Sequence, residues 1–186
     1  MGDSVTEGMI EVSEKRTEII SYSEFQKRAN KPMVRPGIWK WKEVYPRLME
    51  SVGQDGMGSG RGGVSLVHND TEGSYGVSPT MNTVVQVLKP GESNEPHRHT
   101  NVALFLVFEG SGYSIIDGEK LEWEKGDLCV APAWSEHEHC NTSDTEDAIL
   151  LTIQDVPAVA SMGTMFVEEP IGAAPRHIVK KNIKKD

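Results

Sequence analysis

The chain has 186 residues, a formal net charge of −9 and two cysteines. The length is that of one domain and is enough to bury a core without disulfide or metal support. The acidic balance argues against nucleic acids and anionic membrane surfaces as partners. Two cysteines are too few for a disulfide scaffold. With polar first residues and no long apolar run, the sequence predicts a cytoplasmic protein without a membrane span.

The N-terminal third is predicted to form an arm with two short helices. One is expected within residues 22–30, and a second over 42–51, where Val44 and Leu48 are apolar at helical spacing. Residues 51–63 are rich in glycine and indicate a flexible loop that could close over a site.

From Val64 onward, short apolar or alternating runs are separated by turn signals, with no helical pattern between them. This spacing is typical of an all-β sandwich or barrel. Asp117–Gly118 is a two-residue hairpin signal. We predict an N-terminal arm over residues 1–63, one barrel over 64–157, and an extended C-terminal tail over 158–186 that packs on the barrel or on a partner subunit. The expected strands are 64–67, 81–88, 102–108, 113–116, 121–123, 128–130 and 148–153.

Four of the six histidines lie in two stretches, residues 97–99 and 137–139. Side chains at i and i+2 of a strand point to the same face, so His97 and His99 can aim at one point inside a barrel. A third imidazole from the second stretch would complete a metal site. Three neutral imidazoles leave open positions on a metal, which is characteristic of catalytic sites, and they accept Fe, Zn, Ni and Cu alike.

These two stretches resemble the two sequence motifs of the cupin superfamily. The resemblance implies the cupin double-stranded β-helix, a jelly-roll barrel, and identifies His137 as the third ligand. Most cupins carry a glutamate ligand where this chain has Ala103, so we expect a three-histidine site without a carboxylate. The matching positions are Gly91, His97, His99 and Gly110 in the first motif, and Gly126, Pro132, His137 and Asn141 in the second.

A closer resemblance, over residues 37–157, is to the ring-cleaving dioxygenases of gentisate, salicylate and 1-hydroxy-2-naphthoate. It is clearest in residues 97–104 and 132–139. Many members of that family carry two cupin domains, and this chain has one. The resemblance implies Fe(II), with Zn, Ni or Mn as alternatives, a small aromatic substrate, and dioxygen. Because cupins commonly pair, we expect a homodimer or a higher homo-oligomer.

The resemblance also assigns roles in substrate binding and catalysis. Arg61 would grip a substrate carboxylate, and His139 would hydrogen-bond a hydroxylate or take its proton, unless it is exposed at a strand end. Phe105 replaces an arginine typical of the family, and Asn82 replaces a tryptophan, so an apolar, nitro- or chloro-substituted ring is expected rather than gentisate. The predicted substrate contacts are Arg61, Asn82, Val84, Gln86, Phe105 and Trp134.

Two other functions remain open from the sequence. One is a metal-dependent cupin that does not use oxygen, such as an isomerase or a polyketide cyclase, in which the metal polarises a carbonyl. The other is a module that binds a small ligand and holds its metal for structural reasons. Oxygen uptake with Fe(II) and hydroxybenzoates separates the dioxygenase from both.

Overall fold

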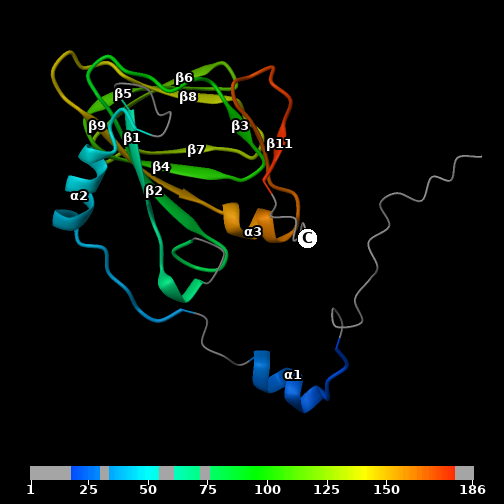
Figure 1. Cartoon of the computed structure of the whole chain (residues 1–186). Helices are drawn as coiled ribbons and strands as arrows, with labels where there is room; N and C mark the ends of the chain where they lie inside the picture. The colour runs from blue at the N-terminus through cyan, green and yellow to red at the C-terminus, as the bar shows by residue number, and fades with distance from the viewer. Residues whose placement is uncertain (1–17, 30–33, 55–60, 72–75, 179–186) are drawn as a thin grey trace, which may run out of the picture. The chain divides into compact units, whose positions relative to one another are not determined.

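The computed structural model describes residues 18–29, 34–54, 61–71 and 76–178, and the chain divides into two compact units, residues 1–32 and 33–186. The first unit contains helix α1 (Tyr22–Ala29), drawn in blue in Figure 1. Its N-terminus is capped by Ser21, whose Oγ accepts a hydrogen bond from the Glu24 backbone N–H at 3.2 Å. The helix predicted within residues 22–30 is therefore confirmed.

Helix α2 (Trp41–Glu50) is the first helix among the described residues of the second unit and confirms the helix predicted over 42–51. Its two buried residues are Val44 and Leu48, four positions apart on one face. They pack in one apolar cluster with Val85, Val87 and Ile149. The helix thus covers part of the outer face of the β-sheet, beside β1 and β2 in Figure 1.

Two facing antiparallel sheets form the barrel, which confirms the predicted all-β jelly roll. The larger has the strand order β1-β2-β9-β4-β7, and the smaller has the order β6-β5-β8. Figure 1 shows the smaller sheet lying over the larger one. The strands are β1 (Arg61–Leu66), β2 (Asn82–Leu88), β4 (Ala103–Glu109), β5 (Ser111–Ile116), β6 (Glu119–Glu124), β7 (Leu128–Ala131), β8 (His137–Asn141) and β9 (Ala148–Gln154).

The predicted hairpin at Asp117–Gly118 is confirmed. Ile116 pairs with Glu119 across the turn, and Asp117 and Gly118 have φ values of 48° and 83°. Both values are positive, as a two-residue type I′ turn requires. This turn fixes the register of β5 against β6.

The predicted loop over residues 51–63 is wrong at its end, because Arg61, Gly62 and Gly63 belong to β1 and pair with β2. Gly62 fits this strand because the residues that follow α2 pack against it and leave no room for a side chain. A Cβ on Gly62 would lie 2.6 Å from Ser51 Oγ and 2.9 Å from the Val52 nitrogen. Residues 55–60 of the expected loop lie outside the described part of the chain.

The barrel interior changes from apolar to polar along its length. One end is filled by Leu88, Val107, Trp123, Ala148 and Leu150. Towards the other end, inward positions of β2 and β9 carry amides and a hydroxyl. Gln86 Nε2 donates to Thr152 Oγ1 at 3.2 Å, and Asn82 Nδ2 donates to Gln154 Oε1 at 3.1 Å. The predicted site residues lie at this polar end.

The C-terminal segment was expected as an extended tail and contains regular elements, namely α3 (Val156–Ser161), β10 (Phe166–Glu168) and β11 (Arg176–His177). Strand β10 pairs with β3 (Arg98–His99) in a small third sheet. Arg98 Nε donates to Glu168 Oε2 at 2.6 Å, where Glu168 is only 4% exposed. The segment is thereby bonded to the strand that carries His99. Within the described ranges, no helix is long and apolar enough to cross a membrane.

Candidate metal centre

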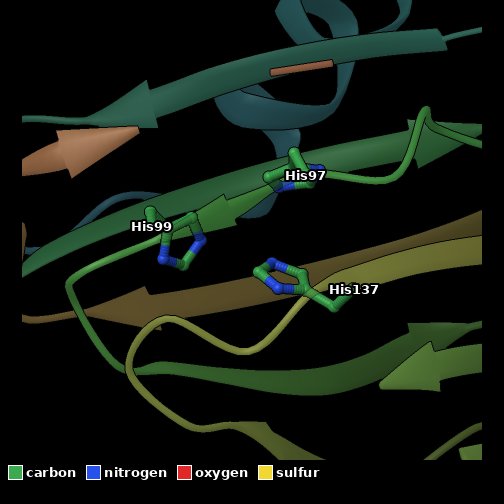
Figure 2. Close-up of side chains that lie close together, drawn as sticks. All are labelled: His97, His99 and His137. Carbon is green, nitrogen blue, oxygen red and sulfur yellow. The ribbon is translucent and has the colours of Figure 1, made fainter. Parts of the chain in front are cut away.

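Three histidines from two neighbouring strand segments converge in the polar end of the barrel. Figure 2 shows the rings of His97, His99 and His137 pointing toward one another. One ligand atom from each lies within 4.8 Å of the others. The backbones of His97 and His137 also exchange two hydrogen bonds, of 3.1 and 2.8 Å. This bridge fixes the separation of the two stretches that the sequence singles out.

A backbone carbonyl orients each of these three rings. Nδ1 of His97 lies 3.0 Å from the Glu95 oxygen, and Nδ1 of His99 lies 3.0 Å from the Asn101 oxygen. His137 makes the same contact with the Ser135 oxygen at 2.9 Å. A carbonyl can only accept, so the neutral rings of His99 and His137 carry their proton on Nδ1 and leave Nε2 with a free lone pair. This is the arrangement that metal-binding histidines usually show. Nδ1 of His97 also lies 3.2 Å from the donor Asn94 Nδ2, so the contacts of His97 fit either tautomer.

The surroundings keep the imidazoles of His99 and His137 neutral. Burial lowers the pKa of His99. Burial, followed by the charge of the neighbouring His97, lowers the pKa of His137 to about 3. His137 Nε2 is buried and has no hydrogen-bond partner among the described residues. A buried nitrogen with an unused lone pair fits a metal ion, because metal ligation requires the neutral ring.

The position of the usual cupin carboxylate is occupied by Ala103, which is fully buried on β4. The group of possible metal ligands found in the described residues consists of the three histidines alone. The centre therefore offers three neutral nitrogen donors, as the sequence predicts. Open positions on a metal held there would face the adjoining cavity.

The cavity beside the histidines has a volume of about 140 Å³. It is lined by several of the predicted substrate contacts, which are Arg61, Val84, Gln86, Phe105 and His139. Three further lining residues were missed in the sequence, namely Thr152, Gln154 and Glu169. Thr152 and Gln154 are polar residues on one face of the otherwise apolar strand β9, and this pattern could have identified them as lining residues. Nothing local in the sequence points to Glu169, which lies beyond the barrel strands.

Arg61 is the only lysine or arginine among the residues lining this cavity. Its Nε is buried and has no hydrogen-bond partner in the described part of the chain. Burial lowers its pKa, while the carboxylates of Glu169, Glu95 and Glu92 act in the opposite direction. A buried guanidinium with an unused donor is poised to bind an anion.

His139 lies inside the barrel, so the alternative of an exposed strand end is wrong. Its side chain is 2% exposed, and the edge of one ring meets the face of the other in its contact with Phe105, with ring centroids 4.2 Å apart. Burial, and then the neighbouring imidazoles, hold the pKa of His139 well below its usual value. Its Nε2 has no partner among the described residues, and its Nδ1 contacts a hydroxyl, Ser114 Oγ, at 2.7 Å.

Two of the predicted substrate contacts, Asn82 and Trp134, are not among the residues that line this cavity. Asn82 reaches it only through its hydrogen bond to Gln154. Trp134 has a positive φ of 65°. The Arg98 guanidinium carbon lies over its ring, 4.7 Å from the ring centroid. Trp134 therefore supports the strand of His99 through a cation–π contact.

The barrel defines a cupin, and its three-histidine group could hold a metal ion. Residues 84–154 match the family model described as "Cupin domain". The chain is 34% identical over 170 residues to a 5-nitrosalicylic acid 1,2-dioxygenase of Bradyrhizobium sp, covering 88% of this chain and 81% of the relative. It is 33% identical to a gentisate 1,2-dioxygenase of Streptomyces sp, covering 74% of this chain but 39% of that protein.

The fold is likewise similar to solved structures. A variant of the salicylate 1,2-dioxygenase from Pseudoaminobacter salicylatoxidans superposes with a TM-score of 0.67 at 25% identity, covering 79% of this chain and 47% of that one. The chain thus spans less than half of these longer relatives. Its likeness to the Bradyrhizobium protein extends over most of both chains. The chain therefore belongs to the cupin family of ring-cleaving dioxygenases.

Proposed function

We propose that the protein is a non-haem Fe(II)-dependent dioxygenase that opens the ring of a hydroxylated aromatic acid. The observation that carries the proposal is the pairing of two features in one cavity. One ligand atom from each of three histidines lies within 4.8 Å of the others, and a half-buried arginine whose Nε has no partner among the described residues lies on the wall beside them. A metal and an anionic substrate would satisfy both.

Each residue would have a distinct task. The histidines would hold the iron, which when bound acts as a Lewis acid, a template and an electron conduit toward dioxygen. Arg61 would bind the substrate carboxylate through its planar fork and so orient the ring. Phe105 would pack against the ring and exclude water from it. With three neutral ligands, the substrate itself supplies the negative charge that a carboxylate ligand supplies in other cupins.

The size of the cavity favours a single ring. Its volume of about 140 Å³ lies well below the roughly 300–1,000 Å³ of pockets for drug-sized ligands. Apart from Arg61, Glu169 and the imidazoles, the described residues of the lining carry no ionisable group, and they include Val84, Phe105 and the Gln86 amide. Phe105 gives a further ring substituent an apolar contact, and the described lining includes no second arginine or lysine. We therefore propose a salicylate whose further substituent is a nitro or chloro group in preference to the hydroxyl of gentisate. The likeness to the 5-nitrosalicylic acid dioxygenase supports this choice.

The test is oxygen consumption by protein loaded anaerobically with Fe(II). Salicylate, its 5-nitro and 5-chloro derivatives and gentisate form the panel, and 4-hydroxybenzoate, which lacks a carboxylate beside the hydroxyl, is the control. We expect uptake with the substituted salicylates, slower uptake with gentisate and none with the control. No uptake with any acid, together with stoichiometric zinc in the purified protein, would refute the dioxygenase. The same metal analysis decides between Fe(II) and Zn, Ni or Mn.

A homodimer stays our proposal for the assembly, and the uncovered outer face of β4 and β7 supports it. Leu104 pairs with Val130, and Leu106 pairs with Leu128. Their side chains form an apolar patch in which Leu128 is 61% exposed and Val130 47% exposed. Helix α2 lies against β1 and β2 and meets β4 at Phe108, through the Trp41 ring. A second copy packing face to face would bury the patch of Leu104, Leu106, Leu128 and Val130. The cytoplasmic location also stays a prediction.

A further inference from the structure

His139 follows His137 by two residues on the same strand face, yet its surroundings differ from those of the three ligand candidates. Each of those rings has a backbone carbonyl at Nδ1. His139 instead has the Ser114 hydroxyl, with 2.7 Å between Nδ1 and Oγ. A hydroxyl can donate or accept, so this contact alone leaves two tautomers possible for the neutral ring. The neighbours of Ser114 decide between them.

Trp123 restricts what the Ser114 hydroxyl can do. The indole Nε1–H only donates, and it lies 2.9 Å from Ser114 Oγ. Ser114 is fully buried, so water does not compete for its single proton. That proton needs an acceptor, because a buried donor left unpaired is costly. The nearby Cys129 sulfur is a weak acceptor, and burial raises the pKa of this thiol and keeps it protonated. His139 Nδ1 is the strong acceptor within reach.

The Trp123 ring is itself held in place by backbone packing. Gly112 lies opposite Trp123 in the hairpin of β5 and β6. A Cβ at Gly112 would approach the Trp123 ring to 2.5 Å and the Cys140 carbonyl oxygen to 2.0 Å. The absence of a side chain at Gly112 therefore leaves room for the indole ring whose Nε1–H donates to Ser114.

We infer that Trp123 and Ser114 form a hydrogen-bond relay that places the proton of His139 on Nε2, so that this ring presents an N–H donor to the cavity. This tautomer is opposite to that of His99 and His137. His139 lies outside the group of ligand atoms within 4.8 Å of one another, and its side chain lines the same cavity. This tautomer also makes His139 a donor to an anionic substrate oxygen, and not the base that takes the hydroxyl proton. Ser114 and Trp123 are then positioning residues.

The role toward substrate rests on the proposed function, but the tautomer does not. His139 lies near enough to Arg61 to sense its charge, and both side chains line the cavity. Two donors that converge on one space, each with an unused N–H, are suited to an anion with more than one oxygen. A carboxylate beside a hydroxylate has this chemistry.

The tautomer can be measured directly by long-range ¹H–¹⁵N correlation on the metal-free full-length protein with ¹⁵N-labelled histidine, at a pH where the rings are neutral. A His139→Gln variant assigns the signals. We expect a protonated Nε2 in His139 and a protonated Nδ1 in His99 and His137. A protonated Nδ1 in wild-type His139 would overturn the inference.

Two variants test the relay itself. Ser114→Ala removes the donor to Nδ1, and Trp123→Phe keeps the aromatic bulk but removes the indole N–H. We expect both to convert His139 to a mixture of tautomers, and Cys129→Ala, the matched control, to keep the wild-type pattern. In zinc-loaded protein, which does not turn over, the salicylate Kd should rise ~10-fold or more in Ser114→Ala.

An unchanged tautomer in both variants, or an unchanged salicylate affinity in Ser114→Ala, would overturn the relay or its role. Absence of oxygen uptake by iron-loaded protein would contradict the proposed function while leaving the tautomer measurement intact. The two failures are therefore distinguishable.

Discussion

Replacing Arg61 by methionine should weaken substrate binding and strengthen the fold at the same time. The guanidinium Nε is buried without a partner among the described residues, and burial lowers the pKa of the side chain. The folded protein therefore carries the cost of a partly desolvated charge, which the carboxylates of Glu169, Glu95 and Glu92 offset only in part. A substrate carboxylate would offset it, so stability and binding respond to the substitution in opposite directions.

The size of both effects follows from the loss of one charged hydrogen-bond partner. Hydrogen bonds to charged groups contribute about 1.5–3 kcal/mol, so KM for a substituted salicylate should rise by ~10–150-fold. An unsatisfied buried donor costs about 1–3 kcal/mol, and because Arg61 is only partly buried the gain in unfolding free energy should be about 1 kcal/mol. Arg61→Lys should recover part of the affinity through its charge but not the bidentate geometry.

Oxygen consumption gives KM, and urea unfolding of the metal-free protein gives the free energy of unfolding. Arg98→Met is the matched control, because Arg98 has a buried partner in Glu168 and its loss should lower stability. If Arg61→Met leaves KM unchanged and lowers stability, then Arg61 is a structural residue and the reasoning fails.

Three further substitutions address the fold, the assembly and the C-terminal segment. Leu48→Ala, at a fully buried position, should lower the free energy of unfolding by about 2–5 kcal/mol, measured in urea, and a loss below 1 kcal/mol would contradict the α2 packing. Leu128→Glu should give a monomer in sedimentation velocity where the wild type is a dimer, and Lys120→Glu, away from the patch, should not. Glu168 has its pKa lowered by the Gly172 N–H and then by Arg98. The wild type should therefore lose stability as the pH falls below ~4.3, the pKa of a glutamate in the unfolded chain. Glu168→Gln should be less stable than the wild type at neutral pH and should lose less stability on acidification. Urea unfolding midpoints from pH 3 to 7 measure both effects.

The metal ligands could be predicted from the sequence because their signal is local. His97 and His99 share a face by strand alternation, and the spacing of glycine and proline around His137 identifies the second stretch. The strands that carry them could not be predicted. β3 has two residues, and β8 reads His-Glu-His-Cys-Asn, so neither has the apolar alternation of a strand. Pairing with neighbouring segments makes them strands, and that pairing is tertiary.

The hydrogen-bond relay to His139 could be predicted only in part from local sequence patterns. Gly110 and Gly112 both read as turn residues, and only Gly110, with φ of 85°, behaves as one. Gly112 lies within β5, opposite Trp123. That pair could have been deduced, because the Asp117–Gly118 turn sets Ile116 against Glu119 and every earlier pair follows by counting.

The pairing of Ser114 with His139 cannot be deduced by counting from a turn. It depends on the register of β5 against β8, two strands separated by β6 and β7 and joined by no tight turn. A shift of one residue would turn Ser114 away from the barrel and bring Tyr113 in. The register is held by packing of the whole barrel and by contacts such as Asn94 Oδ1, which accepts the His139 backbone N–H at 2.7 Å. The proton position on His139 is thus a property of the assembled fold, and the motif that contains the residue does not encode it.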